Sequence, residues 1–106
     1  MGLFAFDDPF AMFDVTPVEN QFILEYLPGA KGDFVKVYLY GLQQCYHPRK
    51  DMGLPVMAQE LNLSVEDILS AYRYWERKGL VQRISDDPPS FQYANVKQRP
   101  LTQQAL

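Results

Sequence analysis

The segment 54–84 constrains the fold of this chain more than any other part of it. It reads LPVMAQELNLSVEDILSAYRYWERKGLVQRI. Apolar residues recur at helical spacing on both sides of Asn62, Ser64 is a favourable helix N-cap, and Gly79 is a favourable C-terminal cap. The pattern predicts a short helix, a tight turn, a longer helix and then an extended segment.

Two further helices are predicted before this segment. Thr16, Pro17 and Glu19 supply a capping hydroxyl, a proline at the first helical position and a carboxylate at the third. We therefore expect a helix to begin at Pro17. Its apolar stripe should comprise Val18, Phe22, Ile23, Tyr26 and Leu27. After a turn that contains glycine, Asp33 is expected to cap a second helix that runs to about Tyr46.

The predicted helix at 33–46 is apolar on nearly all sides. Its main apolar stripe consists of Val35, Tyr38, Leu39, Leu42 and Cys45, and a second apolar surface consists of Phe34, Val37 and Tyr40. A helix of this kind must be covered on both sides, so it should be central or should serve an interface. We interpret Cys45 as a small buried hydrophobic residue rather than a reactive thiol.

Residues 64–96 complete the pattern. Asp67 follows Ser64 by three positions and should complete a capping box. The inward face of the helix that they begin should comprise Val65, Ile68, Leu69, Tyr72 and Trp75. The segments 80–85 and 91–96 are predicted strands joined by the turn DDPPS. The expected fold class is α+β and mostly helical: a winged helix-turn-helix with a small β-hairpin wing.

The two ends of the chain differ from its body. Residues 1–15 form a Phe-rich arm with interleaved aspartates, and residues 16–97 form the winged-helix domain. Residues 98–106 are polar and lack apolar periodicity, so we expect them to begin a flexible linker to a further C-terminal domain. A chain of 106 residues otherwise fits a single domain.

The charges argue against an ordinary DNA reader. Ten Lys and Arg stand against thirteen Asp and Glu, which gives a net charge of −3. Glu66 and Asp67 begin the helix whose N-terminal end would face DNA, and Asp86 and Asp87 lie at the expected wing tip. Phosphate contacts depend on Lys and Arg, so DNA binding should be weak. The candidate partner or weak DNA contacts are Ser70, Arg73, Tyr74, Arg77, Lys78 and Arg83.

No residue pattern typical of catalysis is visible in the sequence. It contains no G-x-S-x-G, no Gly-rich phosphate loop and no metal-ligand spacing, and it has one Cys and one His. We therefore expect a protein that is not an enzyme and needs no cofactor or metal. With no leader or membrane span in view, the expected location is the cytoplasm. His47, in a polar loop, is interpreted as a solvated residue.

The Phe-rich arm and the second apolar side of the 33–46 helix are predicted to serve self-association. The alternative is that the arm covers this helix within one monomer. The candidate oligomer-interface residues are Phe4, Phe6, Phe10, Phe13, Val15, Phe34, Val37 and Tyr40.

Three stretches resemble the N-terminal domain of DnaD-type primosome proteins of low-GC Gram-positive bacteria. They are TPVENQFILEYLPGAKGDFVKVYLYGLQQCY, LSVEDILSAYRYWERKGLV and FQYANVK, within about Thr16 to Lys97. The resemblance implies a winged-helix domain that oligomerises and contacts the replication initiator, while a separate C-terminal domain supplies most DNA binding. The chain departs from the family pattern in its Phe-rich arm, and no such C-terminal domain is found in it.

The sequence thus favours a non-catalytic scaffold and oligomerisation domain of a bacterial DNA replication initiation or restart protein, acting in primosome assembly and helicase loading. Its expected partners are itself, in a homodimer or higher oligomer, and the replication initiator or other primosome proteins. DNA contact would be weak or would use a separate domain, and no membrane contact is expected. The alternative is a winged-helix DNA-binding transcriptional regulator. An enzyme subunit or small-molecule sensor would need a polar-lined pocket that the sequence does not indicate.

Overall fold

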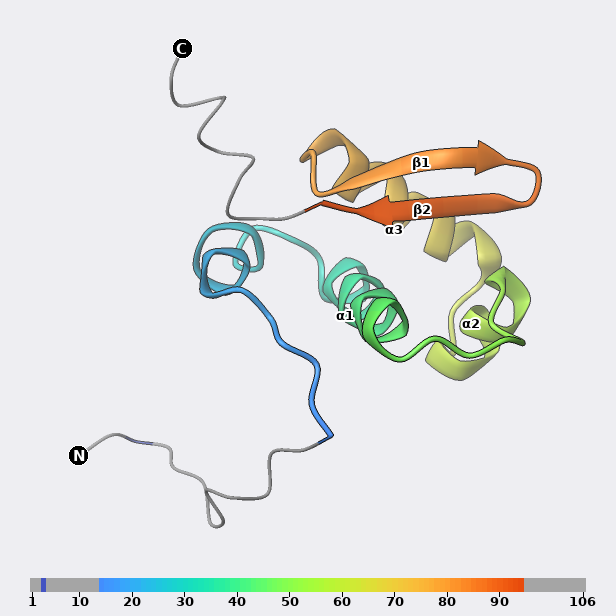
Figure 1. Cartoon of the computed structure of the whole chain (residues 1–106). Coiled ribbons are helices and arrows are strands. Elements are labelled where there is room, and N and C mark those ends of the chain that lie inside the picture. The colour runs from blue at the N-terminus through green and yellow to red at the C-terminus, as the bar shows by residue number, and fades with distance from the viewer. Residues whose placement is uncertain (1–2, 4–13, 95–106) are drawn as a thin grey trace.

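The computed structural model describes residue 3 and residues 14–94, and this part of the chain has an α+β fold of which about half is helical. Its elements in chain order are the π-helix η1 (Phe22–Tyr26), the α-helices α1 (Gly32–Tyr46), α2 (Leu54–Leu61) and α3 (Val65–Arg77), and the strands β1 (Val81–Asp86) and β2 (Pro89–Tyr93). In Figure 1, α1 lies between η1 and α2, and the hairpin of β1 and β2 lies above them. The predicted linker at 98–106 lies outside the described residues.

Local signals set the end of α2 and both ends of α3 as predicted. Asn62 ends α2 in the left-handed conformation at φ 58°. The Asp67 amide donates to Ser64 Oγ at 3.0 Å, and the Ser64 amide donates to Asp67 Oδ2 at 3.1 Å. This reciprocal pair confirms the capping box. Gly79 follows α3 at φ 83°, where the absence of a Cβ removes the steric cost of the turn.

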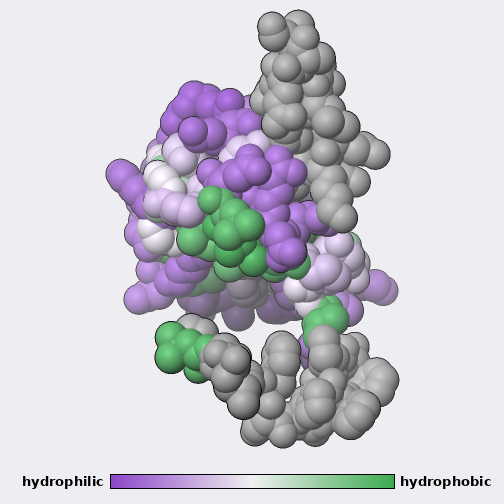
Figure 2. All heavy atoms as spheres, turned by 90° about the vertical axis from the view of Figure 1, so that its left-hand side faces the viewer, coloured by the Kyte–Doolittle hydropathy of each residue, from purple (hydrophilic) through white to green (hydrophobic). Residues whose placement is uncertain are grey.

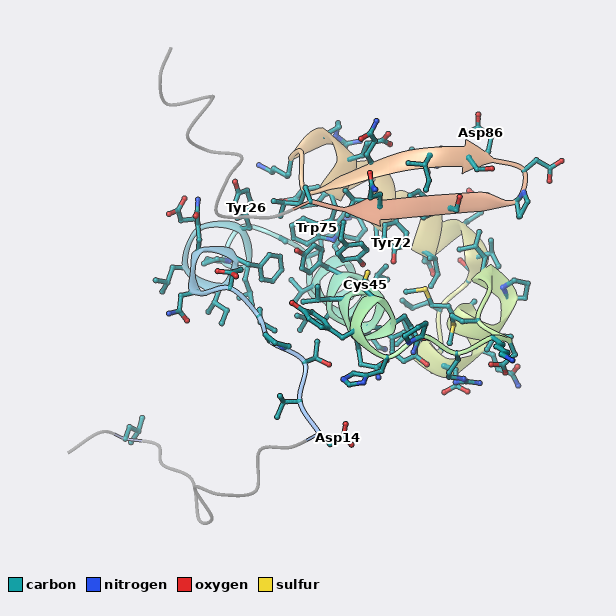
Figure 3. All side chains as sticks on the ribbon, in the orientation of Figure 1. Asp14, Tyr26, Cys45, Tyr72, Trp75 and Asp86 are labelled. Carbon is teal, nitrogen blue, oxygen red and sulfur yellow. The ribbon has the colours of Figure 1, made fainter. Side chains whose placement is uncertain are left out.

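An aromatic cluster joins η1, α1 and α3. The rings of Phe22 and Tyr38 stack with centroids 4.2 Å apart, and the Trp75 ring lies 5.4 Å from Phe22 and 5.1 Å from Tyr38. The Trp75 indole Nε1–H donates to the Phe34 carbonyl at 2.8 Å. Figure 3 shows Trp75 and Tyr72 lying between the hairpin and α1. Since Phe22 and Trp75 are completely buried, this cluster is the centre of the core.

Buried hydroxyl groups connect the hairpin to α1. Tyr93 donates its hydroxyl proton to the Tyr38 carbonyl at 3.0 Å, and the Tyr72 hydroxyl lies 3.0 Å from that of Tyr93. A phenol has one proton, so Tyr72 donates to Tyr93. A Cβ added at Gly41 would collide with both hydroxyls. Glycine at this position of α1 therefore makes room for the hydrogen-bonded pair.

The hairpin is longer towards its turn than predicted. β1 and β2 are antiparallel, Val81 pairs with Tyr93, and Asp86 pairs with Pro89. The expected strands at 80–85 and 91–96 and the five-residue turn were wrong in these bounds, because Pro89 and Ser90 already belong to β2. Proline has no amide proton to contribute to a ladder, and the first residue of a strand is a position that tolerates it.

The helix expected to begin at Pro17 begins later. Residues 15–19 have no regular structure, and the helical segment starts at Asn20. The Leu27 amide donates to the Phe22 carbonyl at 2.9 Å, which is a π-helical bond. A π-turn holds more residues than an α-turn, so the apolar spacing no longer follows one face. Ile23, predicted to be inward, is 42% exposed.

Two inward faces also differ from the prediction. α1 begins at Gly32 after Lys31, so Asp33 lies in its first turn and does not cap it. On α3, Val65 is 36% exposed, whereas Ala71 is completely buried. Val65 is the first residue of α3 and extends past the packed surface. The small Ala71 side chain instead lies among the core residues.

The space around Gly41 predicts a destabilising Gly41→Ala substitution, even though alanine favours helices by about 1 kcal/mol. The added methyl group must displace the hydroxyls of Tyr72 and Tyr93, and overpacking of this kind typically costs about 1–3 kcal/mol. Urea denaturation measures the change. Gly32→Ala is the matched control, because nothing lies within 4 Å of its added Cβ. Equal stability of the two variants would contradict this account of the core.

Burial of the tyrosine hydroxyls predicts a loss of stability in alkali. Burial raises the pKa of Tyr38 and Tyr72 to about 12 and raises the pKa of Tyr93 well above its ordinary value. Below pH 10 these phenols are protonated in both states. Above it the unfolded chain ionises first, so the free energy of unfolding should fall between about pH 10 and 12.

Urea midpoints measured from pH 7 to pH 12 test this prediction. Tyr93→Phe should change the free energy of unfolding at neutral pH. It should also reduce the fall in that free energy between about pH 10 and 12, because one buried phenol is removed. An unchanged midpoint up to pH 12 in the native sequence would refute the assignment of these hydroxyls to the core.

Candidate protein-interaction surfaces

The outward face of α3 is acidic at one end and basic at the other. Asp67 is held in the capping box, and Glu66 beside it is exposed. Arg73 is exposed in the middle of the helix and donates to Ser70 Oγ at 3.0 Å. Arg77 ends the helix, about 16 Å from Glu66 at 1.5 Å per residue. The arrangement complements the helix dipole, and it places carboxylates at the N-terminal end of α3.

The tip of the hairpin is also acidic. Arg83, one of the predicted DNA contacts, forms an ion pair with Asp86 at 3.2 Å and lies 5.4 Å above the Phe91 ring. Asp87 is exposed in the turn. Because Asp86 neutralises its charge, Arg83 is less able to bind phosphate than its place in the sequence suggests.

The C-terminal end of α3 and the N-terminal end of α1 together form a surface that we call the basic aromatic patch. It consists of Lys31, Phe34, Tyr74, Arg77 and Lys78. The rings of Phe34 and Tyr74 lie 5.2 Å apart, and cationic groups of the other three residues lie 5.5–6.0 Å from ring centroids. The structure thus brings Tyr74, Arg77 and Lys78, predicted as partner contacts, next to Phe34, predicted for self-association.

The predicted oligomer interface is only partly available as a surface. Val37 is completely buried in the core, so its assignment to an intermolecular contact was wrong. It was assigned from helical spacing, whereas packing of α1 against the rest of the core covers this side. Phe34 and Tyr40 are half-buried, and Val15 is 47% exposed. The predicted contacts Phe4, Phe6, Phe10 and Phe13 lie outside the described residues.

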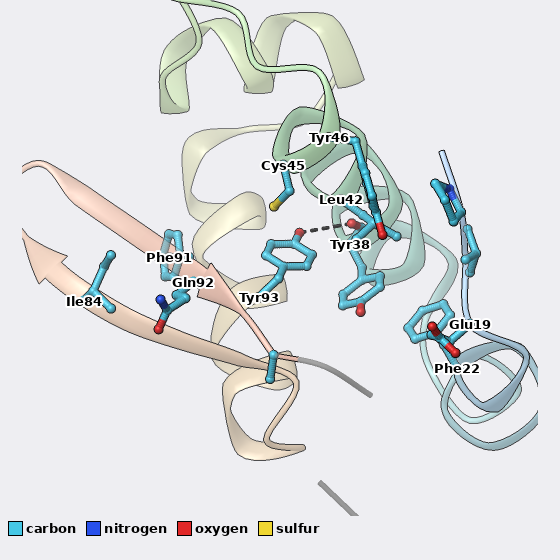
Figure 4. Close-up of a pocket in the computed structure, with 13 residues that line it drawn as sticks. Glu19, Phe22, Tyr38, Leu42, Cys45, Tyr46, Ile84, Phe91, Gln92 and Tyr93 are labelled. Carbon is cyan, nitrogen blue, oxygen red and sulfur yellow. Dashed lines mark hydrogen bonds between the residues drawn. The ribbon is translucent and has the colours of Figure 1, made fainter. Parts of the chain in front are cut away.

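An open groove of about 570 Å³ lies between residues 17–19, α1 and the hairpin (Figure 4). Tyr46 on α1 and Ile84 on β1 line it and are 53% and 58% exposed. His47 Nε2 lies 3.1 Å from the Val15 carbonyl, which holds the segment before the groove against the end of α1. His47 itself is exposed as predicted. The groove is therefore a second surface with exposed apolar side chains.

Cys45 lies at this groove and is exposed, so the prediction of a buried residue was wrong. The last turn of α1 borders both the groove and a smaller cavity of about 280 Å³, and Cys45 lines both. Although the residue is exposed, partial burial of its thiol raises the Cys45 pKa. A raised pKa disfavours the reactive thiolate form of Cys45.

A third surface lies over η1 and was missed by the sequence analysis. Figure 2 shows apolar atoms gathered near the centre of this face with hydrophilic residues around them. In η1, Ile23 and Leu24 are 42% and 73% exposed. The run FILEY gave no signal for an outward apolar pair, because its spacing also fits an inward helical stripe.

The described residues contain neither a cluster of metal ligands nor a membrane-spanning helix. Within 14–94, no group of three or more His, Cys, Asp and Glu side chains could hold a metal ion. The longest helix there, α1, has 15 residues, and none is both long and apolar enough to cross a membrane.

Comparison of the chain with protein-family models, with curated proteins and with solved structures gives no match.

Proposed function

We propose that this chain is a non-catalytic scaffold and oligomerisation domain of a bacterial DNA replication initiation or restart protein, with a winged-helix fold. The observation that carries the proposal is the placement of carboxylates on α3 and on the hairpin. Glu66 and Asp67 occupy the N-terminal end of α3, and Asp86 and Asp87 occupy the hairpin tip. In a winged helix that reads DNA these are the regions that approach the duplex.

The order of elements supports a winged helix. α2 and α3 are joined by a three-residue turn, Asn62 to Ser64, and α3 is followed directly by the antiparallel hairpin. Carboxylates at the DNA-facing positions repel phosphate, and they suit hydrogen-bonded contacts with basic groups of a protein. In this proposal α3 and the hairpin bind an initiator or other primosome protein in the cytoplasm.

Exposed apolar side chains support self-association. Val15, Ile23 and Leu24 are exposed within a short stretch, and the groove adds Tyr46 and Ile84. Scattered apolar side chains are common on monomers, but clusters of them mark protein contacts. The Phe-rich arm, residues 1–15, would add further apolar area and would exchange between copies of a homodimer or higher oligomer.

A DNA-binding transcriptional regulator is the second candidate, and the unpaired cations favour it. Within residues 14–94, Arg73, Arg77 and Lys78 form no ion pair with a carboxylate. Their charges are therefore available to phosphate. The two candidates differ in the expected affinity for duplex DNA.

Duplex binding by the isolated chain should be weak and insensitive to sequence. Selection from random duplexes, followed by fluorescence anisotropy at two salt concentrations, should give dissociation constants no tighter than roughly 10⁻⁶ M. Glu66→Lys should raise the affinity, because it removes the repulsion at the leading end of α3. Lys50→Ala removes one positive charge in an exposed loop and is the control for Arg73→Ala and Arg77→Ala. A selected operator bound near 10⁻⁹ M and lost on Arg73→Ala or Arg77→Ala would establish the regulator instead.

Deleting residues 1–13 should convert an oligomer to a monomer, because the arm supplies aromatic contacts between copies. Multi-angle light scattering measures the mass, and circular dichroism should show that the helices remain. A second, full-length variant with Ser in place of Phe4, Phe6, Phe10 and Phe13 should also be monomeric, because it lacks the same aromatic side chains. If the mass stays the same in both variants, the arm has no part in assembly.

A further inference from the structure

The two rings of the basic aromatic patch are held against the core, whereas its cations are exposed. The Phe34 carbonyl accepts the hydrogen bond of the buried Trp75 indole, and the Tyr74 ring lies edge-on to Trp75 with centroids 4.9 Å apart. The two patch rings are thus attached to the core. Lys31, Arg77 and Lys78 are exposed above them, and within residues 14–94 none of the three is paired with a carboxylate.

The cations lie close to the patch rings. Lys31 Nζ is 5.5 Å from the Phe34 centroid, and the Arg77 guanidinium and Lys78 Nζ are 6.0 Å and 5.6 Å from that of Tyr74. Cation–π contacts of this kind are worth about 0.5–1 kcal/mol at exposed sites. They hold three positive charges near one another before any ligand arrives. Lys31 also lies at the N-cap of α1, where the helix dipole disfavours a cation, so an anionic partner would relieve an unfavourable placement.

The patch suits carboxylates better than nucleic acid. Proteins that bind single-stranded nucleic acids stack the bases on aromatic rings. In the basic aromatic patch the cationic groups already lie over the two rings and would compete with a base for them. Asp33 and Glu76 are exposed and directly precede Phe34 and Arg77 in the sequence, so carboxylates interrupt the positive charge of the patch. A phosphate backbone carries a charge at every nucleotide and must meet these carboxylates, whereas a peptide can place apolar side chains beside them. A peptide that alternates carboxylates with apolar side chains would match both components of the patch.

This chain contains such a peptide. Residues 4–14 read FAFDDPFAMFD, with four Phe, three Asp and neither Lys nor Arg. We propose that this acidic aromatic segment of one copy docks on the basic aromatic patch of a second copy. The aspartates then lie against Lys31, Arg77 and Lys78, and the phenyl groups against the two patch rings. The inference rests on the proposed self-association and assigns its surface.

The arm leaves its own domain at the end of α1 that lies away from the patch of the same copy. The carbonyl of Val15 contacts His47 at the C-terminal end of α1, whereas Lys31 and Phe34 lie at its N-terminal end. The two ends of this helix are about 21 Å apart at 1.5 Å per residue. In a two-fold pair with antiparallel α1 helices, the arm of each copy would begin beside the patch of the other.

Charge reversal and charge exchange in the full chain test the proposal. Lys31→Glu with Lys78→Glu should weaken the dimer, measured by sedimentation equilibrium, by about tenfold or more. Asp7→Lys with Asp8→Lys should have a similar effect. Combining all four substitutions should restore association to within about threefold of the native value, because the attractive pairs are re-formed with opposite signs. Lys50→Glu, an exposed charge reversal outside the patch, changes the net charge by half as much and should leave the dimer intact.

The possible results separate this proposal from the more general one. If residues 1–13 are needed for the dimer but the patch variants leave it unchanged, the arm docks elsewhere, and only the assignment of the patch fails. If the dimer survives removal of the arm, the proposed self-association through the arm fails as well. If a labelled single-stranded oligodeoxythymidine binds the patch and Lys31→Glu abolishes that binding, the ligand is nucleic acid and the arm assignment is overturned.

Discussion

The hydrogen bond from the Trp75 indole to the Phe34 carbonyl is the contact on which the rest of this structure depends. A buried indole N–H without a partner would be costly, and Trp75 is completely buried. The bond therefore fixes how α3 is rotated against α1. Through that rotation it determines which side chains of α3 face outward, from Glu66 at one end to Arg77 at the other. The proposed surfaces for partners are consequences of one core contact.

Where the controlling interaction is local, the sequence was sufficient to predict the local structure. Ser64 and Asp67 bond across three residues, Asn62 adopts the left-handed conformation within its own turn, and Gly79 does so immediately after α3. Each of these depends on backbone geometry and on neighbours within a few positions. The order of the helix, turn, helix and hairpin was predictable for this reason.

Burial and the composition of the candidate surfaces were less predictable, since both depend on which elements meet. Helical spacing placed Val37 and Cys45 on apolar sides of α1, but packing against the core covers the first and leaves the second open. Likewise, Phe34 and Tyr74 are forty residues apart, and no pattern in either segment indicates that their rings touch. Lys31 joined the patch only through that contact.

The absence of a side chain at Gly41 ties three distant positions together. The space that a Cβ would occupy is filled by the hydroxyls of Tyr72 and Tyr93. Glycine is required there only while both oxygens are present. In a diverged sequence with the same fold, phenylalanine at 72 or 93 would lift part of that restriction and admit alanine at 41. These three positions should therefore be substituted together in the course of evolution, although they lie on three different elements.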